Sequence, residues 1–203
     1  MSGEPAAPQL AQTLTDLFAE DQRVRAELAA GGALYEGYNA RMRAVHEANA
    51  ARLDEIVRAH GWPGMHLVGK AGAEAAFRIA LHAIGLPQFQ RRCLKLVKLA
   101  VARGDADARY AAYLDDRIAF NERRPQKYGT QFDWGRNGDM VPWQVDDEKA
   151  VERRRQALGM TPFAAQVEKV RDEWRRSKER APLDWHARER EIEAWAREVG
   201  WLP

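Results

Sequence analysis

The sequence predicts a mainly α fold, a compact multi-helix bundle with one inserted antiparallel β-hairpin. Most of the chain repeats apolar residues every three or four positions, which is the period of an amphipathic helix. The stretch from about Lys127 to Val145 is instead aromatic, β-branched and interrupted by glycines. Because a single hairpin is only marginally stable alone, we expect the helices to hold it.

The first two helices are expected over residues 10–30 and 35–60. Leucines repeat at helical spacing through the first, and Gly31-Gly32 ends it. The second carries an apolar stripe that includes the polar Asn49, and the turn Gly61-Trp62-Pro63 follows its end. Both are therefore predicted to be amphipathic helices packed on a core.

Three more helices are expected before the hairpin, over residues 69–84, 88–102 and 107–122. The first of these three is small and apolar nearly all round, which is typical of a helix buried at the centre of a bundle. Gly85-Leu86-Pro87 separates it from the next helix, and Gly104-Asp105 ends that one.

The last three helices are expected over residues 146–158, 161–176 and 184–199. Aspartates can cap the first and the last of them, and Thr161-Pro162 has the chemistry of an N-cap followed by a first helical residue. These three helices complete the predicted order of elements.

The domain organisation follows from these elements. Residues 1–9 contain two prolines and are expected to be a flexible tail, and residues 10–176 are expected to form a single helical domain. The segment 183–203 is predicted to fold back onto that domain as a clasp. Three tryptophans serve as its anchors: Trp185, Trp195 and Trp201.

Composition excludes several classes of protein. No apolar run approaches the roughly 20 residues that span a bilayer, and no signal peptide is recognised, so we expect a cytoplasmic protein of bacterial type. The single cysteine, Cys93, lies in a helical pattern and is expected to be a small core residue. The only serines, Ser2 and Ser177, are peripheral, which argues against a serine hydrolase.

Metal, cofactor and nucleic-acid sites are not predicted. No His-x-x-x-His motif occurs, and no histidine follows a Glu-x-x spacer, so the sequence predicts no metal ligands and no cofactor. A mononuclear site made of His82 and a carboxylate is the minor alternative. Arg91, Lys95 and Lys98 form a basic stripe on one helix, which could contact phosphates but is typical of a solvated face. The net charge of +2 likewise indicates no polyanionic partner.

His82 is the strongest single candidate for chemistry. It lies on the alanine-rich helix, where an imidazole is either a hydrogen-bonded core group or a general acid–base group. Because both ring nitrogens of a buried imidazole need partners, we expect a polar side chain from another element beside it. Asp21, Arg25 and Asn49 interrupt apolar stripes and are predicted either to satisfy each other or to bind a substrate beside His82.

A second set of candidates surrounds the hairpin. Asp115 and Arg117 could turn inward as catalytic groups or form structural pairs, whereas Asp116 between them is expected to be solvated. Strand alternation places Gln126, Tyr128 and Thr130 on one face and Gln131 on the other. Gly129 indicates the close approach of a backbone or a ligand. These side chains either bind a substrate or attach the strand to the helices.

The order of landmarks resembles a bacterial family known as domain of unknown function 6624, over about residues 21–167. The landmarks run as follows: Asn49, Gly61-Trp62-Pro63, Val68-Gly69, His82, Asp116-Arg117, Gln126 to Gln131, Arg153-Arg154 and Leu158-Gly159-Met160. The Gly-Trp-Pro turn and the Tyr-Gly-Thr-Gln segment are its most specific parts. The resemblance implies domain limits and polar positions, and it implies no activity, cofactor or substrate.

Two functions from different classes remain open. The first is a small enzyme that binds a small polar or anionic substrate in a polar pocket, with His82 as acid–base group, Arg117 as clamp, and Tyr128 and Gln131 as orienting groups. The second is a non-catalytic binding or adaptor module that uses the hairpin and a tryptophan-rich surface. A deep polar site favours the first, and a flat apolar patch favours the second. The oligomeric state is left open.

Overall fold

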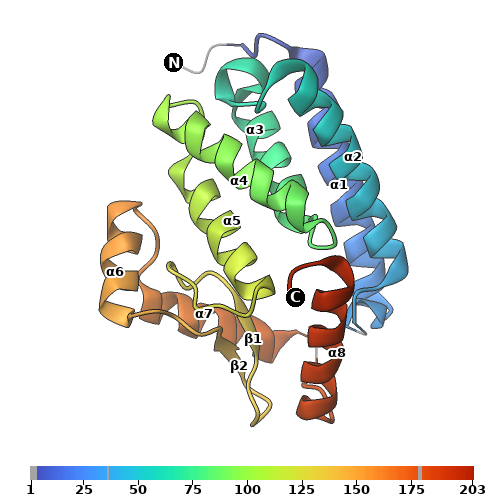
Figure 1. The fold of residues 1–203 in the computed structure, drawn as a ribbon, viewed down its shortest axis with the longest axis vertical. Coiled ribbons are helices and arrows are strands. Elements are labelled where there is room, and N and C mark those ends of the chain that lie inside the picture. Colours follow the sequence, from blue (N-terminus) through green and yellow to red (C-terminus); the bar gives the residue numbers. More distant parts are fainter. Residues whose placement is uncertain (1–3, 36, 178–179) are drawn as a thin grey trace. The chain divides into compact units, whose positions relative to one another are not determined.

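A computed structural model describes residues 4–35, 37–177 and 180–203, and within them the fold is mainly helical with one antiparallel β-hairpin, as predicted (Figure 1). The elements are α1 (Pro8–Ala30), η1 (Ala33–Tyr35), α2 (Ala40–His60), α3 (Met65–His82), α4 (Pro87–Ala102), α5 (Ala108–Asn121), β1 (Phe132–Trp134), β2 (Met140–Pro142), α6 (Glu148–Ala157), α7 (Phe163–Arg176) and α8 (Trp185–Val199). Among the described residues, no helix is both long and apolar enough to cross a membrane.

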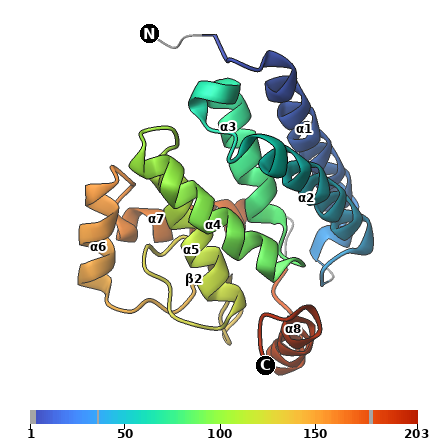
Figure 2. The same cartoon turned by 45° about the horizontal axis from the view of Figure 1, so that its top comes forward.

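The chain divides into two units, Met1–Leu114 and Asp115–Pro203, and the boundary falls within α5. In the first unit, α1 packs along α3 and α2 (Figure 2). The alanine-rich α3 is central, as predicted, and its small residues allow close packing: a Cβ added at Gly72 would lie 3.2 Å from the Cα of Ala11. Cys93 is buried in the same core, and this burial raises the pKa of its thiol to about 12, so it is a core residue.

Two helices of the first unit begin at places that differ from the prediction. Helix α2 starts at Ala40, after the predicted residue 35, because Asn39 caps it by accepting the backbone N–H groups of Arg41 and Met42. Helix α3 starts earlier than predicted, at Met65, and kinks at Gly69, where φ is 68°. Glycine tolerates this left-handed conformation, so the residue predicted to open the helix instead interrupts it.

The N-terminal segment is partly ordered rather than a free tail. The N–H of Ala6 donates to the carbonyl of His66 at 3.2 Å, and the N–H of Ala7 donates to Leu67 at 2.8 Å. Pro8 and Gln9, which were assigned to the tail, already belong to α1. Residues 1–3 of the predicted tail lie outside the described residues.

In the second unit, the hairpin is shorter than predicted. Strands β1 and β2 pair antiparallel over three residues each, with Phe132 opposite Pro142 and Trp134 opposite Met140. The segment from Tyr128 to Gln131 is a loop and not a strand. Its predicted division into two faces is therefore wrong, because side chains take up most of its backbone groups, and among the described residues only the Gln131 carbonyl accepts a backbone N–H from the other arm of the hairpin, that of Trp143.

Asp116 organises that loop, and the prediction that it is solvated is wrong. Its buried carboxylate accepts the backbone N–H groups of Lys127, Tyr128 and Thr130 at 2.8, 3.1 and 3.0 Å, and also the Thr130 hydroxyl at 3.0 Å. Burial raises the pKa of Asp116, although these hydrogen bonds favour the charged form. The helical pattern around Asp116 predicted an exposed side chain, because helix periodicity does not show that the loop after Gln126 folds over this position.

The C-terminal helix is bonded to the hairpin within the second unit. Asp184 caps α8 by accepting the N–H of Ala187, as predicted. The indole N–H of Trp185 donates to the carbonyl of Trp134 at 2.8 Å, and Arg188 pairs with the buried Asp133 at 2.5 Å. These contacts hold α8 against the hairpin.

Removing residues 183–203 is therefore expected to lower the Tm by several degrees. The truncation deletes the Trp185 hydrogen bond and leaves the Asp133 carboxylate buried without its arginine, which is the costly way to break a buried pair. Each kcal/mol lost corresponds to roughly 2–4 °C for a chain of this size. Thermal unfolding followed by circular dichroism measures the shift, and an unchanged melting curve would show that α8 adds nothing to the fold.

Candidate functional site

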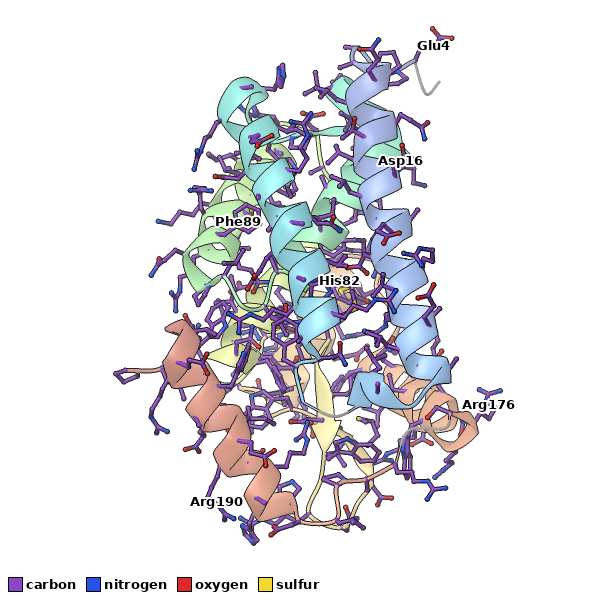
Figure 3. The ribbon with its side chains drawn as sticks, turned by 90° about the vertical axis from the view of Figure 1, so that its right-hand side faces the viewer. Glu4, Asp16, His82, Phe89, Arg176 and Arg190 are labelled. Carbon is purple, nitrogen blue, oxygen red and sulfur yellow. The ribbon has the colours of Figure 1, made fainter. Side chains whose placement is uncertain are left out.

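Three titratable side chains from three helices of the first unit meet at one place. Asp21 of α1, His46 of α2 and His82 of α3 form what we call the Asp–His cluster, and His82 lies between α1 and α2 (Figure 3). Asp21 falls in the apolar stripe of α1, close to the buried Val24. His82 ends α3, and Gln90 holds that end by donating its side-chain N–H groups to the carbonyls of Ala80 and Leu81.

The carboxylate of Asp21 is the centre of the Asp–His cluster. Its Oδ2 lies 2.9 Å from Nδ1 of His82 and 3.1 Å from Nε2 of His46. The two imidazole rings are tilted toward each other, with centroids 5.4 Å apart. The second nitrogen of His46, Nδ1, lies 2.9 Å from the hydroxyl of Tyr38, so both ring nitrogens of His46 have a polar neighbour.

Electrostatics keep Asp21 ionised. Burial by itself would raise the pKa of Asp21, but hydrogen bonds and attraction from His46 and His82 outweigh it and hold the pKa well below its ordinary value. Burial raises the pKa of Tyr38, which therefore stays protonated. The Asp21 carboxylate therefore stays negatively charged, and it contacts both imidazole rings.

The cluster is graded in exposure, and His82 is its outermost member. The Asp21 side chain is 1% exposed, that of His46 is 9% exposed, and that of His82 is 20% exposed. A molecule arriving from solvent would therefore meet His82 first. This grading distinguishes the cluster from a fully sealed polar network.

The prediction that His82 lies beside a polar side chain of another element is confirmed by Asp21. Asn49 is also buried, but it donates its amide N–H to the carbonyl of Leu17 at 2.9 Å and so ties α2 to α1. Arg25 is exposed, so its predicted place on the apolar stripe is wrong. The preceding residue on that turn, Val24, takes the buried position instead.

The remaining predicted site residues belong to the second unit. Asp115 pairs with Lys127 at 3.4 Å, and Arg117 is half-buried. Gln126 is fully buried and uses its amide on the backbone of Gln131 and Trp143. Gln126 therefore holds the two arms of the hairpin together through its side chain.

Two further hairpin candidates have local partners. The side chain of Gln131 donates to the hydroxyl of Thr130 at 2.8 Å, and the carbonyl of Tyr128 accepts from Arg155 at 2.6 Å. Two tryptophans of the hairpin region, which a binding module would present to a partner, also have contacts inside the unit. Trp134 is buried against Trp174, and Trp143 donates its indole N–H to the backbone carbonyl of Arg124. The second unit therefore uses the Gln131 side chain, the backbone carbonyl of Tyr128 and these two rings to hold its loop and hairpin.

His46 was missed by sequence reasoning, although a signal was present. It lies four residues after Met42 and three before Asn49, both of which were placed on the buried stripe of α2. Residues at these spacings share one helix face, so the periodicity that singled out Asn49 also includes His46.

The Asp–His cluster could also hold a metal ion. One ligand atom from each of Asp21, His46 and His82 can be chosen so that all three lie within 4.8 Å of one another. Spacing within the sequence does not reveal this set, because its three residues come from three separate helices. Two imidazoles and one carboxylate are ligands that first-row transition metals accept.

Comparison with known proteins gives a family but no activity. No curated protein and no solved structure matches this chain significantly. The sequence profile of one family, described as Family of unknown function (DUF6624), matches residues 8–176. Since this match covers most of the chain, including every member of the Asp–His cluster, the protein belongs to the DUF6624 family.

Proposed function

We propose that this protein is a small enzyme whose catalytic centre is the Asp–His cluster and whose substrate is small and polar or anionic. The observation that carries the proposal is the buried Asp21 carboxylate held between two imidazoles, one of which reaches solvent. A cytoplasmic setting is part of the proposal and is supported by the single cysteine, which forms no disulfide. A bacterial origin is also part of it and is supported only by the resemblance to a bacterial family.

The energetic cost of this arrangement supports a functional role. Removing a carboxylate from water costs several kcal/mol, by order of magnitude, even after the protein relaxes around it. A structural core at the junction of α1, α2 and α3 could be built from apolar side chains, as most of the core of this unit is. A buried carboxylate whose pKa is strongly perturbed by two imidazoles, one of them partly exposed, is typical of active sites.

The groups in the cluster also indicate the class of substrate. One carboxylate and two imidazoles offer hydrogen bonds and lone pairs, and these groups recognise polar atoms. His82, as the outermost member, is the side chain that we expect to contact the substrate. Asp21 fixes the ring of His82 through Nδ1, so the ring has a defined orientation toward an incoming molecule.

The test compares His82→Gln with His60→Gln, a matched change at an exposed histidine at the end of α2. Each protein is incubated with a defined mixture of sugar phosphates, carboxylic acids, amino acids and nucleotides, and the consumption of each compound is followed by mass spectrometry. The wild type and His60→Gln are expected to convert the same compound at the same rate. His82→Gln is expected to convert it at least about tenfold more slowly, which is about 1.4 kcal/mol of barrier.

Folding is checked on the same samples by circular dichroism and thermal melting. Glutamine can keep one hydrogen bond to Asp21, so His82→Gln is expected to stay folded. A variant that converts the compound as fast as the wild type would remove His82 from the catalytic centre. A wild type that consumes none of these compounds would contradict the proposed substrate class.

A further inference from the structure

We propose that the Asp–His cluster binds one divalent first-row transition metal ion, such as Zn²⁺, through Asp21, His46 and His82. The proposal that the ion binds does not depend on the proposed function. Its use on a substrate rests on the proposed function, which this inference deepens by naming what the catalytic centre holds. The geometry, the ligand types, the surrounding contacts and the charge each support it.

The distances fit an ion placed among the three side chains. Metal–ligand bonds from imidazole nitrogen and carboxylate oxygen are about 2.0–2.2 Å long, which puts neighbouring ligand atoms roughly 3 Å apart. Oδ2 of Asp21 lies 2.9 Å from Nδ1 of His82 and 3.1 Å from Nε2 of His46. Two of the three spacings are therefore close to those that an ion would impose, and all three ligand atoms lie within 4.8 Å of one another.

The ligand types select the kind of ion. Ca²⁺ and Mg²⁺ prefer sites made wholly of oxygen atoms. Two imidazole nitrogens with one carboxylate oxygen instead suit Zn²⁺, Fe²⁺ or Co²⁺. Because the ligands come from α1, α2 and α3, the ion would join three helices that already pack on one another.

The surroundings of His46 support a coordinating role. A histidine that binds a metal through one nitrogen usually donates the proton on its other nitrogen to a polar neighbour. Nδ1 of His46 lies 2.9 Å from the Tyr38 hydroxyl, whose oxygen can accept that proton. This contact orients Nε2 toward Asp21, where the ion would sit.

The charge and exposure of the site deepen the proposed substrate class. One ionised carboxylate and two neutral imidazoles around a divalent cation leave a net charge of about +1, which attracts anionic and polar oxygen groups. Three protein ligands leave at least one position for water or a substrate. Since His82 is the most exposed ligand, at 20%, that position is expected on its side.

The experiment measures metal binding directly and needs no substrate. The full chain is treated with a chelator, dialysed, and titrated with Zn²⁺ by isothermal titration calorimetry, with Mg²⁺ as the oxygen-preferring control. The wild type and His60→Gln are expected to bind one Zn²⁺ per chain and to ignore Mg²⁺. His46→Gln and His82→Gln are each expected to bind Zn²⁺ at least about tenfold more weakly, since even supporting contacts are worth that much.

Two further measurements keep the outcome decisive. Thermal melting in the absence of metal shows whether each variant is folded, and bound Zn²⁺ should raise the Tm of the wild type and not that of the variants. Co²⁺ added to the wild type should give the visible absorption of a cobalt ion with nitrogen ligands. This last measurement tests the proposal even if both histidine variants fail to fold.

The proposal is overturned if the wild type binds no Zn²⁺, if Co²⁺ shows only its spectrum in water, or if folded His46→Gln binds as tightly as the wild type. These outcomes are distinct from failure of the proposed function. Loss of conversion in His82→Gln without metal binding would leave an ion-free enzyme. One tightly bound Zn²⁺ without any conversion would leave a metal site with no catalytic role.

Discussion

Replacing Asp116 with alanine is expected to lower the free energy of unfolding by about 3 kcal/mol or more. The carboxylate accepts three backbone N–H groups and one hydroxyl of a loop that covers it. A buried donor left without an acceptor costs about 1–3 kcal/mol, and alanine would strand several at once. The loop would have to open to water, so the loss falls in the range that only broken buried networks reach.

The neighbouring Asp115→Ala is the matched control. Asp115 is more exposed and pairs with Lys127 at 3.4 Å, a contact of the surface kind that is worth about 0–1 kcal/mol. Urea unfolding of both variants gives the comparison, with equal m-values required for it to be valid. Equal losses in the two variants would mean that the Asp116 network does not hold the loop.

Gly129→Ala is expected to cost about 3 kcal/mol, for two separate reasons. The backbone of Gly129 has φ of 65°, and this left-handed conformation costs other residues about 1–2 kcal/mol. A Cβ at this position would also lie 2.3 Å from Cε2 of Phe163, the first residue of α7. Such overpacking costs typically about 1–3 kcal/mol.

Gly159→Ala separates the two contributions. Gly159 has φ of 59°, but a Cβ there would meet no atom within 4 Å, so only the backbone cost applies. The difference in unfolding free energy between the two variants measures the clash with Phe163. A second substitution, Phe163→Leu, is expected to recover part of the loss in Gly129→Ala. If the two glycine variants were equally stable, Phe163 would not be as close to Gly129 as described.

The spacing of apolar residues was sufficient to predict the helices, because it indicates which face each helix buries. Alanine-rich α3 was placed at the centre of its bundle for this reason, and glycine and aspartate marked several of the helix ends. Boundaries shifted where a side chain decided them, as at Asn39, whose capping bonds delay the start of α2. Capping geometry depends on local backbone angles that a residue pattern does not contain.

The candidate site could be predicted only in part. His82 was expected to have a polar neighbour, because a buried imidazole needs partners that its own helix does not offer. The completion of the cluster by His46 depends on how α1, α2 and α3 are rotated about their axes, which spacing within one helix does not fix. The loop after Gln126 was predicted as a strand because it contains aromatic and β-branched residues. The same residue types also occur in a loop that buried side chains hold, as Gln126 does here.

The loop from Lys127 to Thr130 is held by two buried charges of opposite sign. Asp116 accepts its N–H groups, and the buried Arg155 donates to the carbonyls of Tyr128 and Gly129. Replacing either side chain would leave buried backbone groups of this loop without their hydrogen-bond partners. The conformation of the loop therefore depends on two positions, one for its N–H groups and one for its carbonyls.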